Sequence, residues 1–157
     1  MSEPEQLVEK KDGIATLTLN RPKAMNALSQ KLVSSIGKAF LELKEDDKTG
    51  VVILTGAGRA FCAGIDLKEL SEQGISERKT DAAETLDMLD IMHDYDRPII
   101  GAINGVASTG GFELALGCDF LIASTQARFA DTHARVGVMP GWGLSQKLGR
   151  MIGIGRA

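Results

Sequence analysis

Two uninterrupted apolar segments, each followed by glycine-rich sequence, limit most strongly what this chain can fold into. Residues 51–55 read Val-Val-Ile-Leu-Thr and lead into Gly56-Ala-Gly58, and residues 98–103 read Pro-Ile-Ile-Gly-Ala-Ile before a second glycine-rich segment. Strands without polar alternation are typical of a sheet that is covered on both faces. Because these strands alternate with helical segments, the sequence predicts βαβ units with right-handed crossovers and therefore an α/β fold.

The segments around these two strands contain start and stop signals for further elements. Residues 7–10 and 14–19 flank Asp12-Gly13 and predict a β-hairpin, because the second segment alternates apolar and polar side chains. Ser29 is expected to cap a helix that runs to about residue 45. The buried stripe of that helix is Leu32, Ile36, Ala39, Phe40 and Leu43. The other expected elements are a helix at 66–72, a polar stretch at 73–81, a helix ending near 95 with Leu86, Leu89, Met92 and Tyr95, a helix at 111–117, a strand at 119–124 and a helix from 143 to about 151.

Length and composition indicate one soluble globular domain. The chain has 157 residues, 43% of them hydrophobic and 25% charged, which is enough for one real core. Its net charge of -3 offers no basic field to nucleic acid or an anionic membrane, and no apolar run reaches the roughly 18 residues of a membrane span. The N-terminus lacks the apolar core of a secretion signal. Cys62 and Cys118 are expected to be reduced core thiols, which favours the cytoplasm.

The two glycine-rich segments, residues 56–64 and 104–111, follow strand ends, where parallel sheets bind their ligands. Neither contains a GxGxxG dinucleotide fingerprint, and the chain has no GxxxxGK(S/T) phosphate loop or GxSxG nucleophile elbow. Ordinary tight turns would explain either loop taken alone. Together, their small residues and free helix N-terminal N–H groups favour an oxyanion hole, in which two N–H groups point at one ligand oxygen. Glu113, in the next helical turn, either lies near that ligand or serves only the helix dipole.

Four motifs follow one another along nearly the whole chain. They are Asn20-Arg-Pro-Lys-Ala-Met-Asn-Ala-Leu28, Phe61-Cys-Ala-Gly-Ile-Asp-Leu-Lys68, Asn104-Gly-Val-Ala-Ser-Thr-Gly-Gly-Phe-Glu-Leu-Ala115 followed by Cys118-Asp119, and Phe129-Ala-Asp-Thr-His-Ala-Arg-Val-Gly137 with Pro140-Gly-Trp-Gly143. In order and spacing they resemble the motifs of the crotonase (enoyl-CoA hydratase/isomerase) family. The resemblance implies a ββα-spiral core, with residues 1–157 as one crotonase-like domain that is truncated before the C-terminal helical region.

The resemblance also implies an acyl-CoA thioester as the ligand, and it assigns residues to the parts of that ligand. The backbone N–H groups of Ala63 and Gly110 would hold the thioester oxygen, and Lys23 and Ala24 would lie near the nucleotide of CoA. Four consecutive residues would line the CoA side: Ala63, Gly64, Ile65 and Asp66. Family members need neither a metal nor a redox cofactor, and they assemble as trimers or dimers of trimers.

The chain departs from the family pattern at one position of the site. Family hydratases resemble one another in placing two glutamates about the attacking water; the first corresponds to Glu113, and the second falls on His133. Imidazole titrates near neutral pH, so His133 would shuttle the proton or hold the water. The other interpretation is a structural histidine bonded to Asp131 or to the Thr132 backbone. Asp131 is a further candidate carboxylate, on the same side as His133 if this segment is strand-like.

Three functions remain open at this point. The sequence favours an enoyl-CoA hydratase that adds water to a trans-2-enoyl-CoA, with Glu113 activating the water and returning the proton. The missing second glutamate leaves two alternatives, a non-catalytic acyl-CoA-binding module and an isomerase of the same family that uses Glu113 alone. The remaining candidates have weaker signals. We expect His93, Lys68 and Glu69 to be exposed, and Asp66 to cap a helix. Arg59 is either a surface charge or a contact to a CoA phosphate, and Trp142 is either a packing residue or a substrate contact.

Overall fold

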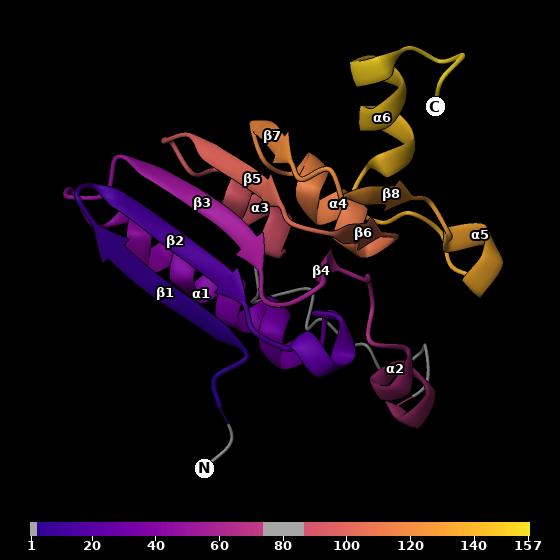
Figure 1. Cartoon of the computed structure of the whole chain (residues 1–157), viewed down its shortest axis with the longest axis horizontal. Coiled ribbons are helices and arrows are strands. Elements are labelled where there is room, and N and C mark those ends of the chain that lie inside the picture. The colour runs from indigo at the N-terminus through magenta and orange to yellow at the C-terminus, as the bar shows by residue number, and fades with distance from the viewer. Residues whose placement is uncertain (1–2, 74–86) are drawn as a thin grey trace.

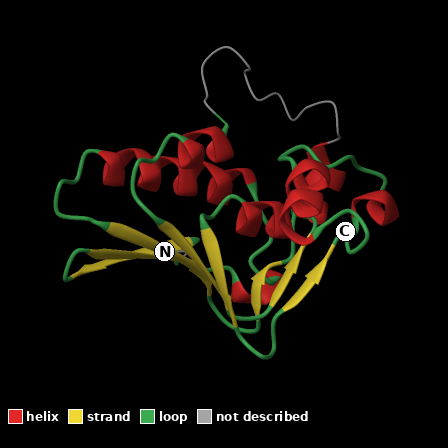
Figure 2. Ribbon diagram, turned by 90° about the horizontal axis from the view of Figure 1, so that it is seen from above, coloured by secondary structure: helices red, strands yellow, loops and turns green. Residues whose placement is uncertain are grey.

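Two β-sheets, with helices packed along them, form the architecture of the chain (Figure 1). The computed structural model describes residues 3–73 and 87–157. The larger sheet has the strand order β1 (Gln6–Lys11), β2 (Ile14–Leu19), β3 (Val51–Gly56), β5 (Ile99–Ile103) and β7 (Phe120–Ala123). The smaller sheet has the order β4 (Ala60–Cys62), β6 (Val106–Ser108) and β8 (Arg128–Ala130). Figure 2 shows the two sheets meeting at an angle, with most helices along one side.

The pairing of the larger sheet follows the sequence pattern. Strands β1 and β2 form the predicted antiparallel hairpin, closed by Asp12 and Gly13 with φ angles of 51° and 80°. Positive φ at both positions suits an Asp-Gly turn, whose twist matches that of its strands. Strands β2, β3, β5 and β7 pair in parallel. Both the hairpin and the parallel α/β arrangement are therefore confirmed.

The two faces of the larger sheet are covered unequally. Along β3, buried Val52 and Leu54 alternate with the partly exposed Val51, Ile53 and Thr55. Strand β2 has the same alternation, and its buried side chains belong to the core beneath the helices. The prediction of a sheet covered on both faces therefore holds only for the face under the helices, and the other face is partly exposed in the described chain.

The long helix α1 (Gln30–Lys44) supplies one wall of that core. The Ser29 side-chain oxygen accepts the N–H of Leu32 at 3.0 Å, so the predicted N-cap is confirmed. Every member of the predicted apolar stripe is buried. At its other end, the Arg97 guanidinium donates to the carbonyls of Leu43 and Lys44 in the last turn, where carbonyls have no partner further along the helix. The cap determines where this helix begins, and its apolar stripe determines which side packs against the sheet.

The smaller sheet was not predicted. Its strands are three residues long, too short to show a period of two, and β4 and β6 lie within the glycine-rich segments. Glycine is needed there because the backbones approach closely: a Cβ on Gly111 would lie 2.1 Å from the Cys62 carbonyl oxygen. This sheet supports α4 (Gly110–Leu116), all seven residues of which are buried.

The remaining helices are short. They are η1 (Pro22–Ala24), α2 (Leu67–Gln73), α3 (Met88–His93), α5 (His133–Val136) and α6 (Leu144–Ile152). Asp66 caps α2 as expected, accepting the N–H groups of Lys68 and Glu69. A helix begins at His133, so the strand-like geometry considered for Asp131 and His133 does not occur. Leu86 and most of the predicted polar stretch lie outside the described residues.

Two further sequence expectations concern the cysteines and the membrane. Cys62 and Cys118 are both free and buried, as predicted. Burial raises the pKa of each thiol to about 12, because the apolar surroundings disfavour the thiolate. Among the helices of the described residues, none is long and apolar enough to cross a membrane.

Candidate active site

A strained threonine begins the helix that contains Glu113. Thr109 has φ 54° and ψ -123°, a conformation that residues with branched side chains rarely adopt. Its N–H donates to the Ala130 carbonyl at 3.0 Å, and its own carbonyl accepts the N–H groups of Phe112 and Glu113. The chain thus turns from β6 into α4 with the Glu113 side chain inside the protein, where the residue is 2% exposed.

The Glu113 carboxylate is bonded on both of its oxygens. Oε1 accepts the backbone N–H groups of Trp142 at 2.8 Å and Leu144 at 3.2 Å. Oε2 lies 3.2 Å from Nε2 of His133. The Trp142 indole donates in turn to Asp87, the N-cap of α3, at 2.9 Å. A buried carboxylate is tolerated only when its lone pairs are satisfied, and here the partners are His133, Trp142 and Leu144, which follow later in the chain.

His133 connects Glu113 to a second carboxylate. The residue is 2% exposed, and its Nδ1 lies 2.7 Å from Oδ1 of Asp131, which also accepts the His133 backbone N–H at 3.0 Å. The imidazole therefore contacts Glu113 and is also bonded to Asp131. The bond to Asp131 agrees with the structural interpretation of His133, and its part in proton transfer stays a prediction.

The charges around this group favour an ionised Asp131. The hydrogen bond from the His133 backbone N–H, helped by the imidazole, holds the pKa of Asp131 below its ordinary value. Burial lowers the pKa of Lys147 below its ordinary value, and the attraction to Glu113 offsets part of this lowering. Among residues 3–73 and 87–157, no cluster of three or more His, Cys, Asp or Glu side chains is arranged to hold a metal ion.

The two glycine-rich loops meet beside this carboxylate. Gly64 has φ 96°, and a Cβ there would lie 2.8 Å from the Ser108 carbonyl oxygen and 3.3 Å from the Gly110 nitrogen. Within the described chain, the Gly110 N–H has no hydrogen-bond acceptor. The Ala63 N–H, by contrast, donates to the Met25 carbonyl at 3.0 Å. The loops are thus in contact as predicted, but only one of the two expected N–H donors is free.

A small apolar pocket opens next to these loops. It has a volume of about 80 Å³. Its lining consists of Ala63, Ile65, Leu67, Leu70, Thr109, Thr132, Val136 and Val138. The Thr109 and Thr132 hydroxyls bond to each other on its wall. Because most of this lining is aliphatic and it includes Ala63, the pocket suits a short hydrocarbon chain whose polar end points toward the loops.

The predicted CoA-binding turn packs against the same loop. Leu28 N–H donates to the Gly64 carbonyl at 2.7 Å, and Asp66 N–H donates back to the Leu28 carbonyl at 3.2 Å. Arg21 forms an ion pair with Asp66 at 2.8 Å. Lys23 and Ala24 are exposed in η1 nearby. Residues 20–28 and 63–66 are therefore hydrogen-bonded to each other, and their binding of CoA stays a prediction.

Comparison with known proteins identifies the family of the chain. The family model for enoyl-CoA hydratase/isomerase matches residues 9–157. The chain belongs to this family. A probable peroxisomal enoyl-CoA hydratase 1 of Arabidopsis thaliana is 46% identical over 155 residues, which cover 97% of the chain and 56% of that protein.

Solved structures of the family have the same fold. The crystal structure of an enoyl-CoA hydratase from Mycobacterium smegmatis is 49% identical, with a TM-score of 0.83 over 98% of this chain and 62% of that one. An enoyl-CoA hydratase from Bacillus anthracis is 36% identical, with a TM-score of 0.88 over 97% and 60% of the two chains. The crotonase-like α/β fold is confirmed, and the chain spans little more than half the length of these relatives.

Several residues of the site gave no signal in the sequence. The donors to Glu113 are the backbone N–H groups of Trp142 and Leu144. Nearly every residue has such a group, so the sequence cannot show which of them belong to the site.

The structure also shows where the weaker candidates lie. His93 and Arg59 are exposed, although His93 contacts Lys147 at 2.8 Å. Lys68 is exposed and Glu69 half-buried. Trp142 is partly buried against the core, which agrees with a packing role.

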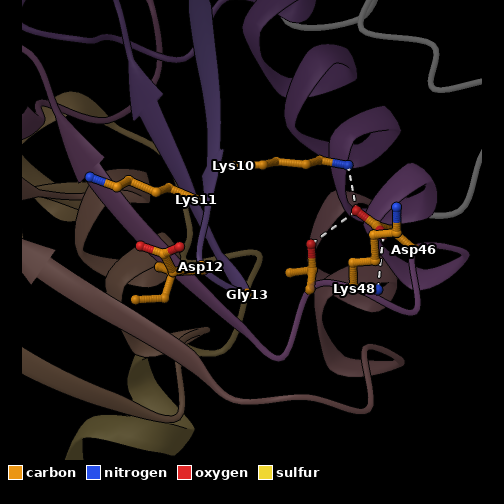
Figure 3. Close-up of a pocket in the computed structure, with 8 residues that line it drawn as sticks. Lys10, Lys11, Asp12, Gly13, Asp46 and Lys48 are labelled. Carbon is orange, nitrogen blue, oxygen red and sulfur yellow. Dashed lines mark hydrogen bonds and ion pairs between the residues drawn. The ribbon is translucent and has the colours of Figure 1, made fainter.

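A larger hollow lies elsewhere, at the turn of the hairpin (Figure 3). Its volume is about 240 Å³, and its lining includes Lys10, Lys11, Asp12, Asp46 and Lys48. Figure 3 shows Lys10 directed at the Asp46 carboxylate, 2.7 Å away, while Lys11 extends in another direction. Neither the glycine-rich loops nor Glu113 borders this hollow, so its size does not make it the candidate site.

Proposed function

We propose that this chain forms the catalytic part of an enoyl-CoA hydratase that adds water to a trans-2-enoyl-CoA thioester. The observation that supports it most is the buried Glu113 carboxylate, fixed by two backbone N–H groups beside the meeting point of the glycine-rich loops. Family membership supports the same reaction, because relatives up to 49% identical are enoyl-CoA hydratases by name.

In the proposed reaction the thioester oxygen lies between the N–H groups of Ala63 and Gly110. Charge that develops on this oxygen is stabilised by such donors, which makes the β carbon open to attack. The Ala63 N–H then shares or exchanges its bond to the Met25 carbonyl. Glu113 takes a proton from water, the water oxygen bonds to the β carbon, and the Glu113–His133 pair returns a proton to the α carbon.

Binding is proposed to follow the motif positions. The acyl chain enters the aliphatic pocket, residues 63–66 line the CoA side, and Lys23 and Ala24 lie near the nucleotide. Residues 1–157 are proposed to belong to one crotonase-like domain, and the active assembly is proposed to be a trimer or dimer of trimers. The cytoplasmic location stays a prediction, since the Arabidopsis relative is named as peroxisomal.

A non-catalytic acyl-CoA-binding module is the second candidate. Two observations favour it: His133 stands where family hydratases have a glutamate, and the Ala63 N–H is bonded to Met25. Loss of enoyl thioester absorbance with the full-length protein separates hydration from binding. A product with a shifted double bond and no added water would instead indicate an isomerase of this family.

The deciding experiment replaces Glu113 by glutamine. The Gln amide oxygen can still accept both backbone N–H groups, so E113Q keeps the fold while losing the proton acceptor. We expect crotonyl-CoA hydration to fall by about 10²- to 10⁴-fold, the usual contribution of a general acid–base residue, with CoA-thioester affinity nearly unchanged. E42Q, on the exposed side of α1, is the matched control. Wild-type activity in E113Q would reject the proposal.

A further inference from the structure

Three side chains form a continuous row at the candidate site: Glu113, His133 and Asp131. The Glu113 and His133 side chains are each 3% exposed, whereas that of Asp131 is 43% exposed. His133 contacts one carboxylate through each ring nitrogen, Asp131 at 2.7 Å and Glu113 at 3.2 Å. The row therefore runs from the solvent, through an imidazole, to the buried carboxylate.

Asp131 fixes which way the imidazole faces. Its Oδ1 accepts two bonds from His133, one from the backbone N–H at 3.0 Å and one from the ring. An ionised carboxylate only accepts hydrogen bonds, so Nδ1 must hold a proton. Turning the ring by half a rotation would break this bond, and Nε2 is therefore kept toward Glu113.

The contact between Nε2 and Glu113 then requires one more proton. With Nδ1 protonated, a neutral imidazole has a bare lone pair at Nε2, and an ionised Glu113 has only lone pairs. Two such acceptors 3.2 Å apart repel each other unless a proton lies between them. That proton belongs either to an imidazolium beside a carboxylate or to a carboxylic acid beside a neutral imidazole. The number of protons is the same in both forms.

We infer that Asp131 is a positioning residue, which holds His133 so that its ring and the Glu113 carboxylate share one proton. The inference rests on the proposed hydratase function. During hydration the pair gains the proton that water loses as its oxygen bonds to the β carbon, and it gives a proton to the α carbon as the double bond is consumed. The pair ends with the single proton it began with, and no oxidant or reductant is needed.

Replacing Asp131 by alanine in the full-length protein tests this role. Ala removes Oδ1 and with it both bonds to His133, and the position is exposed, so D131A is expected to fold. We expect kcat for crotonyl-CoA to fall by about 10- to 100-fold, as when partners that orient a metal-bound imidazole are removed, with KM changed by less than about threefold. D46A is the matched control, because Asp46 accepts the N–H two residues later in the same way, away from the site.

A spectroscopic measurement separates positioning from mere stabilisation. In ¹⁵N NMR spectra, with His133 assigned by its absence in H133Q, Nδ1 should be protonated in the wild type, and the Nε2–H tautomer should appear in D131A, where Nδ1 has lost its acceptor. An unchanged kcat in D131A, or an unchanged tautomer, would overturn the inference while hydration by the wild type still stood. If the wild type fails to hydrate crotonyl-CoA, the proposed function fails, and the tautomer measurement alone decides whether Asp131 positions the ring.

Discussion

Single residues show how a charge is kept inside this protein. Glu113 is buried within an otherwise apolar helix, yet both carboxylate oxygens have partners from other segments. Removing one partner of a buried charge usually costs several kcal/mol, because the charge that remains is neither hydrated nor paired. The Glu113 carboxylate can therefore stay buried only when residues 133–144 are packed against it.

The two thiols give a prediction at the same scale. Cys62 and Cys118 are buried, and each has a pKa raised to about 12, so almost no reactive thiolate exists near neutral pH. We expect neither to react with a thiol-specific chromogenic disulfide at pH 8 in the folded protein. Both should react at once in denaturant, where the absorbance change counts two thiols. Rapid reaction of the native protein would contradict this burial.

Sequence could identify Glu113 and the two loops but not the environment of either. The motifs around Gly64 and Gly110 predicted that the loops would meet, and a close approach at Gly64 is found. Three features had no signal: the strained conformation of Thr109, the Ala63 bond to Met25, and the donors on Glu113. Each depends on where the backbone lies in space, which residue type alone does not encode.

Elements differ in how far their own sequence determines them. Helix α1 could be predicted from its cap at Ser29 and its apolar stripe, because both are local signals. Strands β4, β6 and β8 exist because each has a neighbour to pair with, and three residues are too few for any pattern. Helix α5 is a single turn that begins where Asp131 accepts the His133 N–H, and four residues are too few for a helical pattern in the sequence.

The contact between α4 and β4 gives a prediction at the scale of elements. A Cβ on Gly111 would lie 2.1 Å from the Cys62 carbonyl oxygen and 2.7 Å from its carbon, and backbone atoms cannot rotate away. We expect G111A to lower the free energy of unfolding by about 3 kcal/mol, as overpacking does, measured by urea denaturation. G155A, where a Cβ meets open space, should change it by less than about 0.5 kcal/mol. Equal stability of the two variants would show that the helix can shift.

At the scale of the whole molecule, a surface ion pair connects the β1–β2 hairpin to the residues that follow α1. Lys10 on β1 donates to Asp46 at 2.7 Å, and Asp46 also accepts from the Lys48 N–H and the Thr49 hydroxyl (Figure 3). The hydrogen bond from Lys10 is the main reason that the pKa of Asp46 is lowered from 3.8 to about 2. This group therefore favours the folded state when it is ionised.

The expected consequence is a stability difference that disappears in acid. Because the folded pKa of Asp46 lies below the unfolded one, its stabilisation is complete above about pH 5 and is lost as the pH falls through 3.8 toward 2. The melting temperature of the wild type should exceed that of D46N near pH 6, and the gap should close toward pH 2. D47N, at the next exposed position, is the control. A gap that stays constant down to pH 2 would show that the Asp46 charge is not responsible.

The donors on the Glu113 carboxylate also set an order for protein synthesis. Trp142 and Leu144 follow Glu113 by 29 and 31 residues, so they leave the ribosome after α4 has already emerged. Until then, burying this helix would mean burying a carboxylate without its hydrogen-bond donors, which is costly. The helix can therefore settle only when the chain is complete to at least residue 144. The core around α4 and the hydrogen bonds to Glu113 are therefore expected to form in the same step of folding.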